Sequence, residues 1–265
     1  MATIYKLQPT SSPAPRPMSY QTRYYPESAF GGFTHVDGTI AFYSRVSALL
    51  SPDAVVLDAG CGRGSYAEDP VAWRRDLRIF QGRCQRVIGI DLDPRAAEHP
   101  FLDEFHLLES PRWPLEDESV DVVISDYVVE HLSHPVGYFA EAMRVLRPGG
   151  HFCLRTPNAW GYVALSARLI PNRWHARVVG KVQDDRQAED VFPTFYRCNT
   201  RRRLASALRC AGFEACVYGH EAEPSYLSFS RWSYWAGVLY QRLAPRGMTN
   251  TLFGFAQKPC AAHEV

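Results

Sequence analysis

The sequence is poor in lysine and carries almost no net charge. Only three of its 29 basic residues are lysines (Lys6, Lys181 and Lys258), and 28 acidic residues leave a formal net charge of +1. A chain so close to neutrality has no general electrostatic field that would favour DNA, RNA or an acidic partner. We therefore expect no nucleic-acid partner.

Paired cysteines and long apolar runs are also missing. None of the seven cysteines has C-x-x-C or metal-ligand spacing, so the sequence indicates neither a disulfide framework nor a zinc site. The longest uncharged run, 156–167, is shorter than the roughly 18 apolar residues that span a bilayer. The first 20 residues are polar and proline-rich and do not resemble a secretory leader. These features predict a cytoplasmic protein with reduced thiols.

What the sequence does contain is an alternation of strand-like and helix-like segments. Residues 8–17 form a proline-rich arm ahead of it. Strand-like segments fall at 54–58, 86–91, 103–108, 120–125 and 150–156, and helix-like segments at 39–50, 65–79, 94–98 and 135–146. Such alternation predicts a parallel sheet with helices on both faces.

The alternation breaks after Asn158 and resumes near residue 199. Residues 159–195 have no clean period and are interpreted as an insertion. A helix at 199–211, a strand at 213–219, a helix at 225–243 and a strand at 251–257 follow. The two final strands lack a crossover of the usual kind, so we expect the last strand to run antiparallel.

The most informative stretch runs from Val56 to Gly64. A buried strand ends at Asp58 and enters a turn with glycine at 60, 62 and 64. Glycines let a backbone turn sharply and approach a ligand closely, and a helix starting near Ser65 would aim N–H groups at the same place. Asp91 ends the next strand and can accept hydrogen bonds from ribose hydroxyls, with Leu92 beside it to pack on adenine.

Three cofactor classes use a site of this kind. A phosphate loop needs Gly-Lys-Ser/Thr, but Gly180-Lys181 is followed by Val182. A nicotinamide site favours Gly-x-Gly-x-x-Gly, whereas the spacing here is Gly-x-Gly-x-Gly, and no lysine has a tyrosine four residues before it. S-adenosylmethionine remains, because it has no phosphate and needs a close-packed turn and an acid for its ribose.

Five segments together resemble the class I S-adenosylmethionine-dependent methyltransferases, in the group that includes ubiquinone-biosynthesis and natural-product enzymes. They are Val56–Gly64, Gly89–Asp93, Glu109–Asp121, Ser125–His134 and Arg144–Gly150. The resemblance covers residues 40–158 well and 195–258 more weakly. Two departures are Glu109, where the family usually has aspartate, and a long excursion between Arg74 and Arg83.

The resemblance implies an α/β fold, Rossmann-like and doubly wound. Its mostly parallel seven-stranded sheet has helices on both faces, an antiparallel last strand and a lid insertion after strand five. We divide the chain into an N-terminal arm and cofactor-covering helix (1–50), a cofactor-binding core (51–158), a substrate lid (159–195) and a C-terminal completion of the core (196–265). The expected contacts of S-adenosyl-L-methionine are Asp58, Gly60, Cys61, Gly62, Asp91, Leu92, Glu109, Ser110 and Ser125.

The candidate catalytic residues are Tyr127 and His131, beside the expected position of the methyl group. His131 is the first candidate base because imidazole titrates near neutral pH, although a structural histidine fits the same Glu130-His131 pair equally well. Some relatives bind a metal through Glu-x-x-Glu-His. Tyr127 occupies the first of those positions here, so we expect no metal.

Candidate substrate contacts are Trp160, His175, Tyr196 and Arg197, in and just after the insertion. Aromatic residues there could equally form the small core of a lid. Phe42, Tyr43 and Arg45 are candidates to cover the cofactor, and a helix core is the competing interpretation of the two aromatics.

The aromatic segment Arg231–Arg242 is expected to pack on the sheet, with contact to a membrane surface as the less favoured alternative. We expect a small-molecule acceptor, methylated on oxygen rather than on nitrogen or carbon. The alternatives are N- or C-methylation of a lipid-linked or sugar acceptor and a non-catalytic regulator that binds the cofactor. The oligomeric state, monomer or homodimer, stays open.

Overall fold

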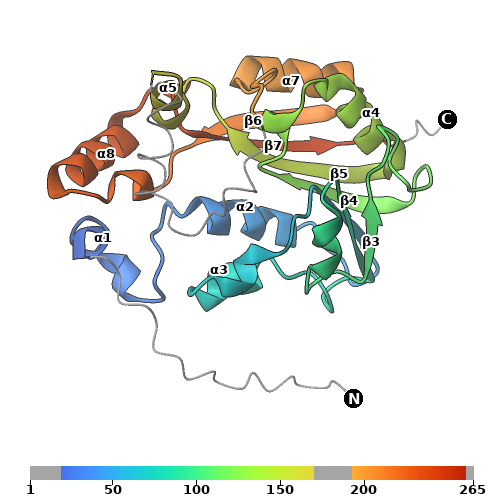
Figure 1. Ribbon diagram of the computed structural model, residues 1–265, viewed down its shortest axis with the longest axis horizontal. Helices are drawn as coiled ribbons and strands as arrows, with labels where there is room; N and C mark the ends of the chain where they lie inside the picture. Colours follow the sequence, from blue (N-terminus) through green and yellow to red (C-terminus); the bar gives the residue numbers. More distant parts are fainter. Residues whose placement is uncertain (1–18, 170–192, 261–265) are drawn as a thin grey trace.

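The computed structural model describes residues 19–169 and 193–260, and its centre is one seven-stranded sheet (Figure 1). The strand order is β3-β2-β1-β4-β5-β7-β6. The strands are β1 (Val55–Ala59), β2 (Arg86–Asp91), β3 (Glu104–Leu107), β4 (Val120–Asp126), β5 (Leu146–Pro157), β6 (Glu214–His220) and β7 (Thr251–Gln257). The seven expected strands are therefore confirmed.

Strand directions also follow the expectation. The first five strands pair in parallel, and β7 lies between β5 and β6 and is antiparallel to both. The order turns back at β1, which has β2 on one side and β4 on the other. In open α/β sheets, ligands bind beyond the carboxyl ends of the strands at such a switch point, here the ends of β1, β2 and β4.

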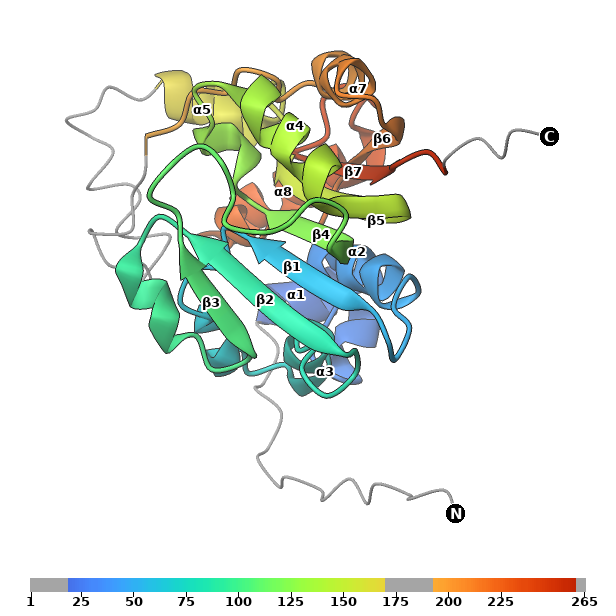
Figure 2. The ribbon, with the colours of Figure 1, turned by 90° about the vertical axis from the view of Figure 1, so that its right-hand side faces the viewer.

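Helices cover both faces of the sheet (Figure 2). On one face, α2 (Gly38–Ser47) buries Phe42 and Val46 in a core that includes Val56 and Phe253. On the other, α4 (Pro135–Val145) and α7 (Arg201–Cys210) bury apolar side chains against β1, β4 and β5. The strands read as continuous apolar runs because both of their faces are covered.

The first helical stretch after the glycine turn is shorter than predicted. Instead of one helix over 65–79, the chain forms a 3-10 turn, η2 (Ser65–Glu68), and one short helix, α3 (Ala72–Asp76). Pro70 lies between them and has no N–H to continue a helix. The start of α2 is as predicted, since the Asp37 carboxylate accepts hydrogen bonds from the N–H groups of Thr39 and Ile40, both at 2.9 Å.

The C-terminal helix α8 (Arg231–Leu243) does not pack on the sheet, so that prediction was wrong. It packs through Tyr234 and Val238 against Tyr25, beside α1 (Ser19–Tyr24) and the 3-10 turn η6 (Ser225–Leu227). Figure 1 shows α1 and α8 together at one end of the molecule. The neighbouring sheet faces are already occupied, by α7 on one side and by Phe42 of α2 on the other.

Four further elements complete the secondary structure of the described residues. They are η1 (Pro26–Ala29), η3 (Pro94–Glu98), η4 (Val129–His131) and α5 (Tyr162–Leu169). Of the helices in the described ranges, none combines the length and apolarity that crossing a membrane requires.

Candidate active site

The turn after β1 has the backbone geometry that only glycine adopts easily. Gly60, Gly62 and Gly64 have φ angles of 83°, 57° and 69°. A Cβ on Gly60 would lie 2.4 Å from Val128, and one on Gly64 would lie 2.8 Å from Pro100. A Cβ on Gly62 would meet nothing within 4 Å. The turn is thus packed behind Gly60 and Gly64 and open in front of Gly62, where a ligand can approach the backbone.

The acid at the end of β2 is tied to this turn. Asp91 Oδ2 accepts a hydrogen bond from the Gly62 N–H at 2.9 Å, and Oδ1 accepts one from the Asp93 N–H at 2.8 Å. An ionised carboxylate has about four acceptor positions, so ribose hydroxyls can still bind. Leu92, the next residue, is 68% exposed and can offer its side chain to a flat ring.

The acid at the end of β1 lies in a charged environment. Burial raises the pKa of Asp58 to about 7, and the negative charge of Asp126 adds to the rise against the opposing effect of Arg78. A carboxyl group with this pKa is close to half ionised at neutral pH. It becomes a strong partner for a cation that enters the site.

The side chains of two expected cofactor contacts, Cys61 and Ser125, make contacts within the protein. The Cys61 side chain packs beside Gly89, where an added Cβ would lie 2.8 Å from its sulfur. Ser125 is fully buried, and its Oγ accepts a hydrogen bond from the Tyr138 hydroxyl at 2.8 Å. Both side chains are thus engaged within the protein, and the expected contacts of Cys61 and Ser125 with a cofactor stay predictions.

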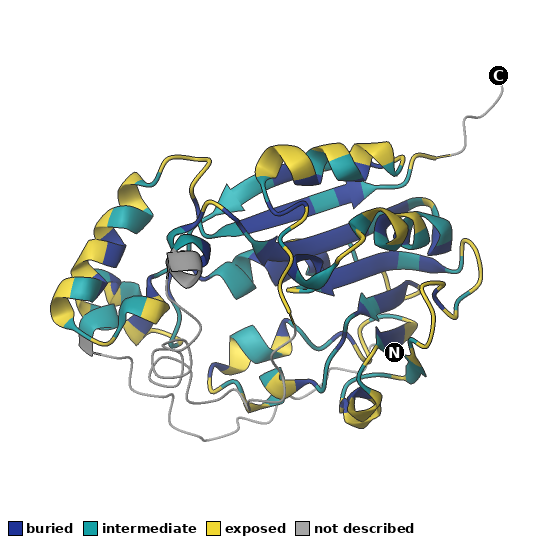
Figure 3. Cartoon of the chain, turned by 45° about the horizontal axis from the view of Figure 1, so that its top comes forward, coloured by how far each residue is buried: buried dark blue, intermediate teal, exposed yellow. Residues whose placement is uncertain are grey.

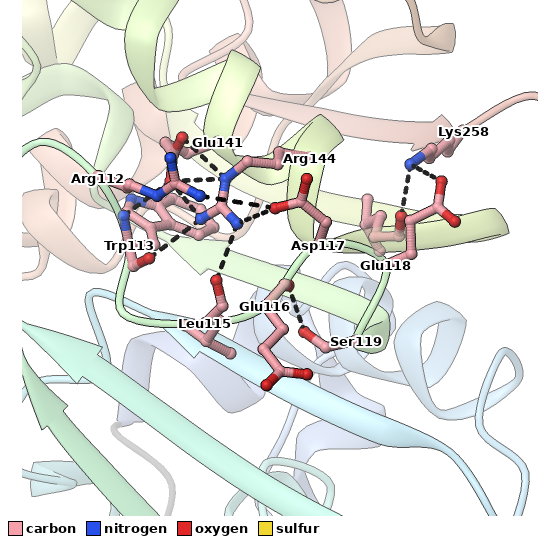
Figure 4. Close-up of polar contacts among 11 residues, drawn as sticks. Arg112, Trp113, Leu115, Glu116, Asp117, Glu118, Ser119, Glu141, Arg144 and Lys258 are labelled. Atoms are coloured by element: carbon pink, nitrogen blue, oxygen red, sulfur yellow. Dashed lines mark hydrogen bonds and ion pairs between the residues drawn. The ribbon is translucent and has the colours of Figure 1, made fainter.

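Glu109 and Ser110 are exposed in the loop that leads from β3 toward β4. One arginine on α4 organises the rest of that loop (Figure 4). Arg144 donates to Glu141 at 2.6 Å, to Asp117 at 2.6 Å, and to the carbonyl oxygens of Trp113 at 3.0 Å and Leu115 at 2.8 Å. The loop beside the expected adenine position is thus fixed by a helix on one face of the sheet.

The candidate catalytic residues follow β4 directly. Tyr127 has a φ of 58°, unusual for a residue other than glycine, and its ring lies 4.8 Å from the Arg155 guanidinium. His131 ends the short η4 turn, and its Nδ1 lies 3.0 Å from the carbonyl oxygen of Pro193. Because a carbonyl only accepts, Nδ1 must carry the proton of that hydrogen bond, while Nε2 lies 3.9 Å from the Glu130 carboxylate.

The segment after the insertion reaches the same place. The backbone N–H groups of Phe195 and Tyr196 both donate to the carbonyl oxygen of Glu130, at 2.8 and 3.2 Å. Tyr196 has a φ of 50°, a second strained position beside η4. The structure therefore brings the backbone of Tyr196, which Arg197 follows, next to Glu130 and so beside η4.

Of the two remaining substrate candidates, Trp160 and His175, only Trp160 lies in the part of the chain that the structure describes. Trp160 is 56% exposed just after β5, where Ala159 bonds to Asn199 of the returning segment. His175 lies outside the described residues. No cluster of three or more metal-ligating side chains occurs in 19–169 or 193–260, and the expectation that the protein uses no metal stays a prediction.

Comparison with known proteins agrees with this geometry. Residues 57–154 match the family model described as "Methyltransferase domain". A Mycolicibacterium smegmatis protein named as an S-adenosylmethionine-dependent methyltransferase is 43% identical over 110 residues, which cover 39% of this chain and 38% of that protein. Residues 57–154 are thus similar to a methyltransferase domain, and the relative's name agrees with the cofactor class that the sequence predicts.

A second sequence relative and a solved structure cover different shares of the chain. The malonyl-[acyl-carrier protein] O-methyltransferase of Serratia marcescens is 34% identical over 107 residues, 37% of this chain and 36% of that enzyme. In both sequence matches the alignment spans less than two fifths of the relative's length. Among solved structures, a chain from the complex between the Haloferax volcanii Trm112 methyltransferase activator and a "putative methyltransferase" has a similar fold, with a TM-score of 0.54. The match covers 92% of this chain and 96% of that one. Because the two sequences are only 18% identical, this similarity supports the fold alone.

Beside the acid at the end of β1 lies a buried charged network that sequence reasoning missed. Arg155 of β5 is 4% exposed and forms two hydrogen bonds of 2.6 Å with Asp126 at the end of β4. Tyr43 donates to the same carboxylate at 2.9 Å, and Arg78 lies 3.7 Å from it. The available signal was an arginine inside an otherwise apolar strand, which requires a buried partner.

Three residues of α2 were candidates to cover the cofactor, and the structure places them differently. Phe42 and Tyr43 are buried in the core, as the competing interpretation held. Arg45 lies with its guanidinium 5.9 Å from the ring of Tyr218 on β6, rather than over the turn after β1. The expectation that Arg45 faces the cofactor was wrong, because α2 presents that position to the far edge of the sheet.

Proposed function

We propose that this protein transfers the methyl group of S-adenosylmethionine to an oxygen atom of a small-molecule acceptor. The observation that carries the proposal is the open space in front of Gly62, bounded by the carboxylate that ends β2. This arrangement suits the ribose and the methionine part of the cofactor. It lies at the switch point of the sheet, where the domain family agrees with the geometry.

Oxygen is favoured as the receiving atom because the site offers a proton acceptor. An oxygen nucleophile must lose its proton as the new bond forms, and a positioned base assists this step. The Nε2 atom of His131 can take that role while Nδ1 is held by Pro193. The named O-methyltransferase among the sequence relatives supports the same choice.

The acceptor side is proposed to lie between η4 and the returning segment 193–197. Tyr196 and Arg197 can bind an anionic or hydroxylated acceptor there, and residues 159–195 are proposed to cover it. Residues 51–158 would then bind the cofactor, with 196–265 completing the sheet. We place the protein in the cytoplasm with a small-molecule partner.

The test begins with the cofactor. Calorimetry with S-adenosylhomocysteine should show binding to the wild type and a loss of at least tenfold in affinity for Asp91→Asn, since the variant no longer presents two carboxylate oxygens to the ribose. Glu98→Gln, in the exposed end of η3, is the matched control and should bind normally. Unchanged affinity of Asp91→Asn would remove the central assignment.

The second stage measures release of S-adenosylhomocysteine with panels of hydroxyl, carboxyl, amine and carbon acceptors. Turnover only with hydroxyl or carboxyl compounds supports O-methylation. Turnover with amines or activated carbons would contradict the oxygen assignment. Cofactor binding without turnover on any panel would favour the regulatory alternative.

A further inference from the structure

The outer face of α8 carries an exposed apolar stripe. Trp232, Trp235, Leu239 and Leu243 are spaced by three, four and four residues, so they share one side of the helix. They are 75%, 47%, 44% and 70% exposed, whereas Tyr234 and Val238 on the inner side are buried. Phe229, 69% exposed, lies two residues before the helix. We call these five exposed residues the α8 stripe.

The charged residues of α8 and of the chain just after it have a single sign. The sequence contains no aspartate or glutamate between Glu223 and Glu264, whereas Arg231, Arg242 and Arg246 lie in or just after the helix. All three arginines are exposed, and the Arg231 guanidinium lies 5.9 Å from the ring of Trp232. The helix itself is therefore apolar, aromatic and cationic, within a chain whose net charge is only +1.

The position of α8 leaves the stripe accessible. The helix lies with α1 at one end of the molecule, away from the sheet (Figure 1), and Figure 3 shows exposed positions along its length. A contiguous apolar face of this kind on a soluble domain marks an interaction site. Two copies meeting through their stripes would bring their arginines together with no acidic side chain on either helix, which disfavours a homodimer.

We propose that α8 docks the protein on an anionic membrane surface. A helix with Trp and Leu on one side and arginines beside them fits the interface between acyl chains and headgroups, where the aromatic rings are stable and the arginines meet lipid phosphates. The helix would lie in the plane of the interface rather than cross it. This inference does not rest on the proposed methyl transfer, because docking requires neither cofactor nor acceptor.

The test is co-sedimentation of the full chain with vesicles of phosphatidylcholine alone or mixed with phosphatidylglycerol. We expect binding to the mixed vesicles that weakens with salt, with a blue shift of tryptophan fluorescence. The double variant Trp232→Ser/Trp235→Ser should bind about tenfold or more weakly, because two large apolar groups no longer enter the interface. Arg242→Gln should bind roughly fivefold more weakly.

Trp73→Ser provides the matched control, because Trp73 on α3 is 58% exposed but lies outside the α8 stripe. It should bind vesicles like the wild type, and all variants should keep their affinity for S-adenosylhomocysteine if they are folded. Absence of vesicle binding, or equal binding by the wild type and the double variant, overturns the proposal. A wild-type dimer in solution that the double variant loses would assign the stripe to a second copy and overturn it as well.

Discussion

Asp58 is a buried carboxyl group whose pKa lies close to neutral pH. Its pKa of about 7 is a consequence first of burial and then of Asp126, and both disfavour its ionised form. The cofactor carries an α-ammonium group that would favour that ionised form. If the cofactor's ammonium group binds Asp58, as we propose, binding below this pKa releases a proton.

This coupling predicts a pH-dependent affinity. S-adenosylhomocysteine should bind more tightly as pH rises toward about 7, by up to tenfold per pH unit, and the affinity should level off above it, where Asp58 is already ionised. Calorimetry between about pH 6 and pH 8 in buffers of different ionisation enthalpy would show the affinity and the released proton. Asp58→Asn should remove the slope, and the same slope in that variant would contradict the assignment.

His131 can be tested separately from cofactor binding. His131→Ala should lower turnover about 100-fold or more if its Nε2 accepts the acceptor's proton, because general base catalysis is typically worth that much. Affinity for S-adenosylhomocysteine should stay within about twofold. His131→Gln can preserve the hydrogen bond to Pro193 without providing a base, so its turnover separates the two roles. Full activity of either variant would make His131 a structural residue.

At the scale of elements, α4 and the loop before β4 form one unit. Arg144 donates to two carboxylates and two carbonyl oxygens, and Glu141 in turn accepts from the Trp113 N–H at 2.7 Å. The hydrogen bond from Arg144 is the main cause that lowers the pKa of Glu141. This unit links the helix covering the sheet to the loop beside the expected adenine position.

Arg144→Ala should lower the free energy of unfolding by about 3 kcal/mol, because it leaves carbonyl groups and a carboxylate without their charged donor. Urea denaturation monitored by circular dichroism measures the change. Arg112→Ala is the control, because the Arg112 side chain is 74% exposed and its ion pair with Asp117 is long at 3.8 Å. This variant should change the free energy of unfolding by less than about 0.5 kcal/mol. Similar losses for the two variants would show that the Arg144 network adds little.

Across the whole molecule, the pair Arg155–Asp126 joins the centre of the sheet to α2. Arg155 binds Asp126 with two hydrogen bonds and also donates to Thr39 at 2.9 Å. Burial alone would raise the pKa of Asp126, but Arg155 more than offsets this and the pKa lies below its usual value. The pair is therefore ionised at neutral pH in the interior.

Asp126→Asn should destabilise the protein by about 3–5 kcal/mol, because the buried Arg155 keeps its charge and loses its counter-ion. Chemical denaturation gives the value. Asp76→Asn removes a partner of Arg75 at 3.0 Å on the surface and should cost less than about 1 kcal/mol. Equal costs for the two substitutions would mean that water or another group compensates the Arg155 charge.

The sequence by itself determined the seven strands, the antiparallel last strand and the cofactor class. These depend on local patterns, since buried parallel strands are continuous apolar runs and the turn after β1 requires glycines at fixed positions. The position of the Asp91 carboxylate beside the turn was predictable for the same reason, because Asp91 ends the strand that follows the turn in the sequence.

Only the tertiary structure decided which residues meet beneath and beside the site. Arg155, Asp126 and Tyr43 come from β5, β4 and α2, and no local pattern relates them. The displacement of α8 from the sheet also followed from competition, since other elements had already covered the neighbouring sheet faces. A sequence period shows that a helix has an apolar side, and the packing of the whole chain decides whether that side is buried or left exposed.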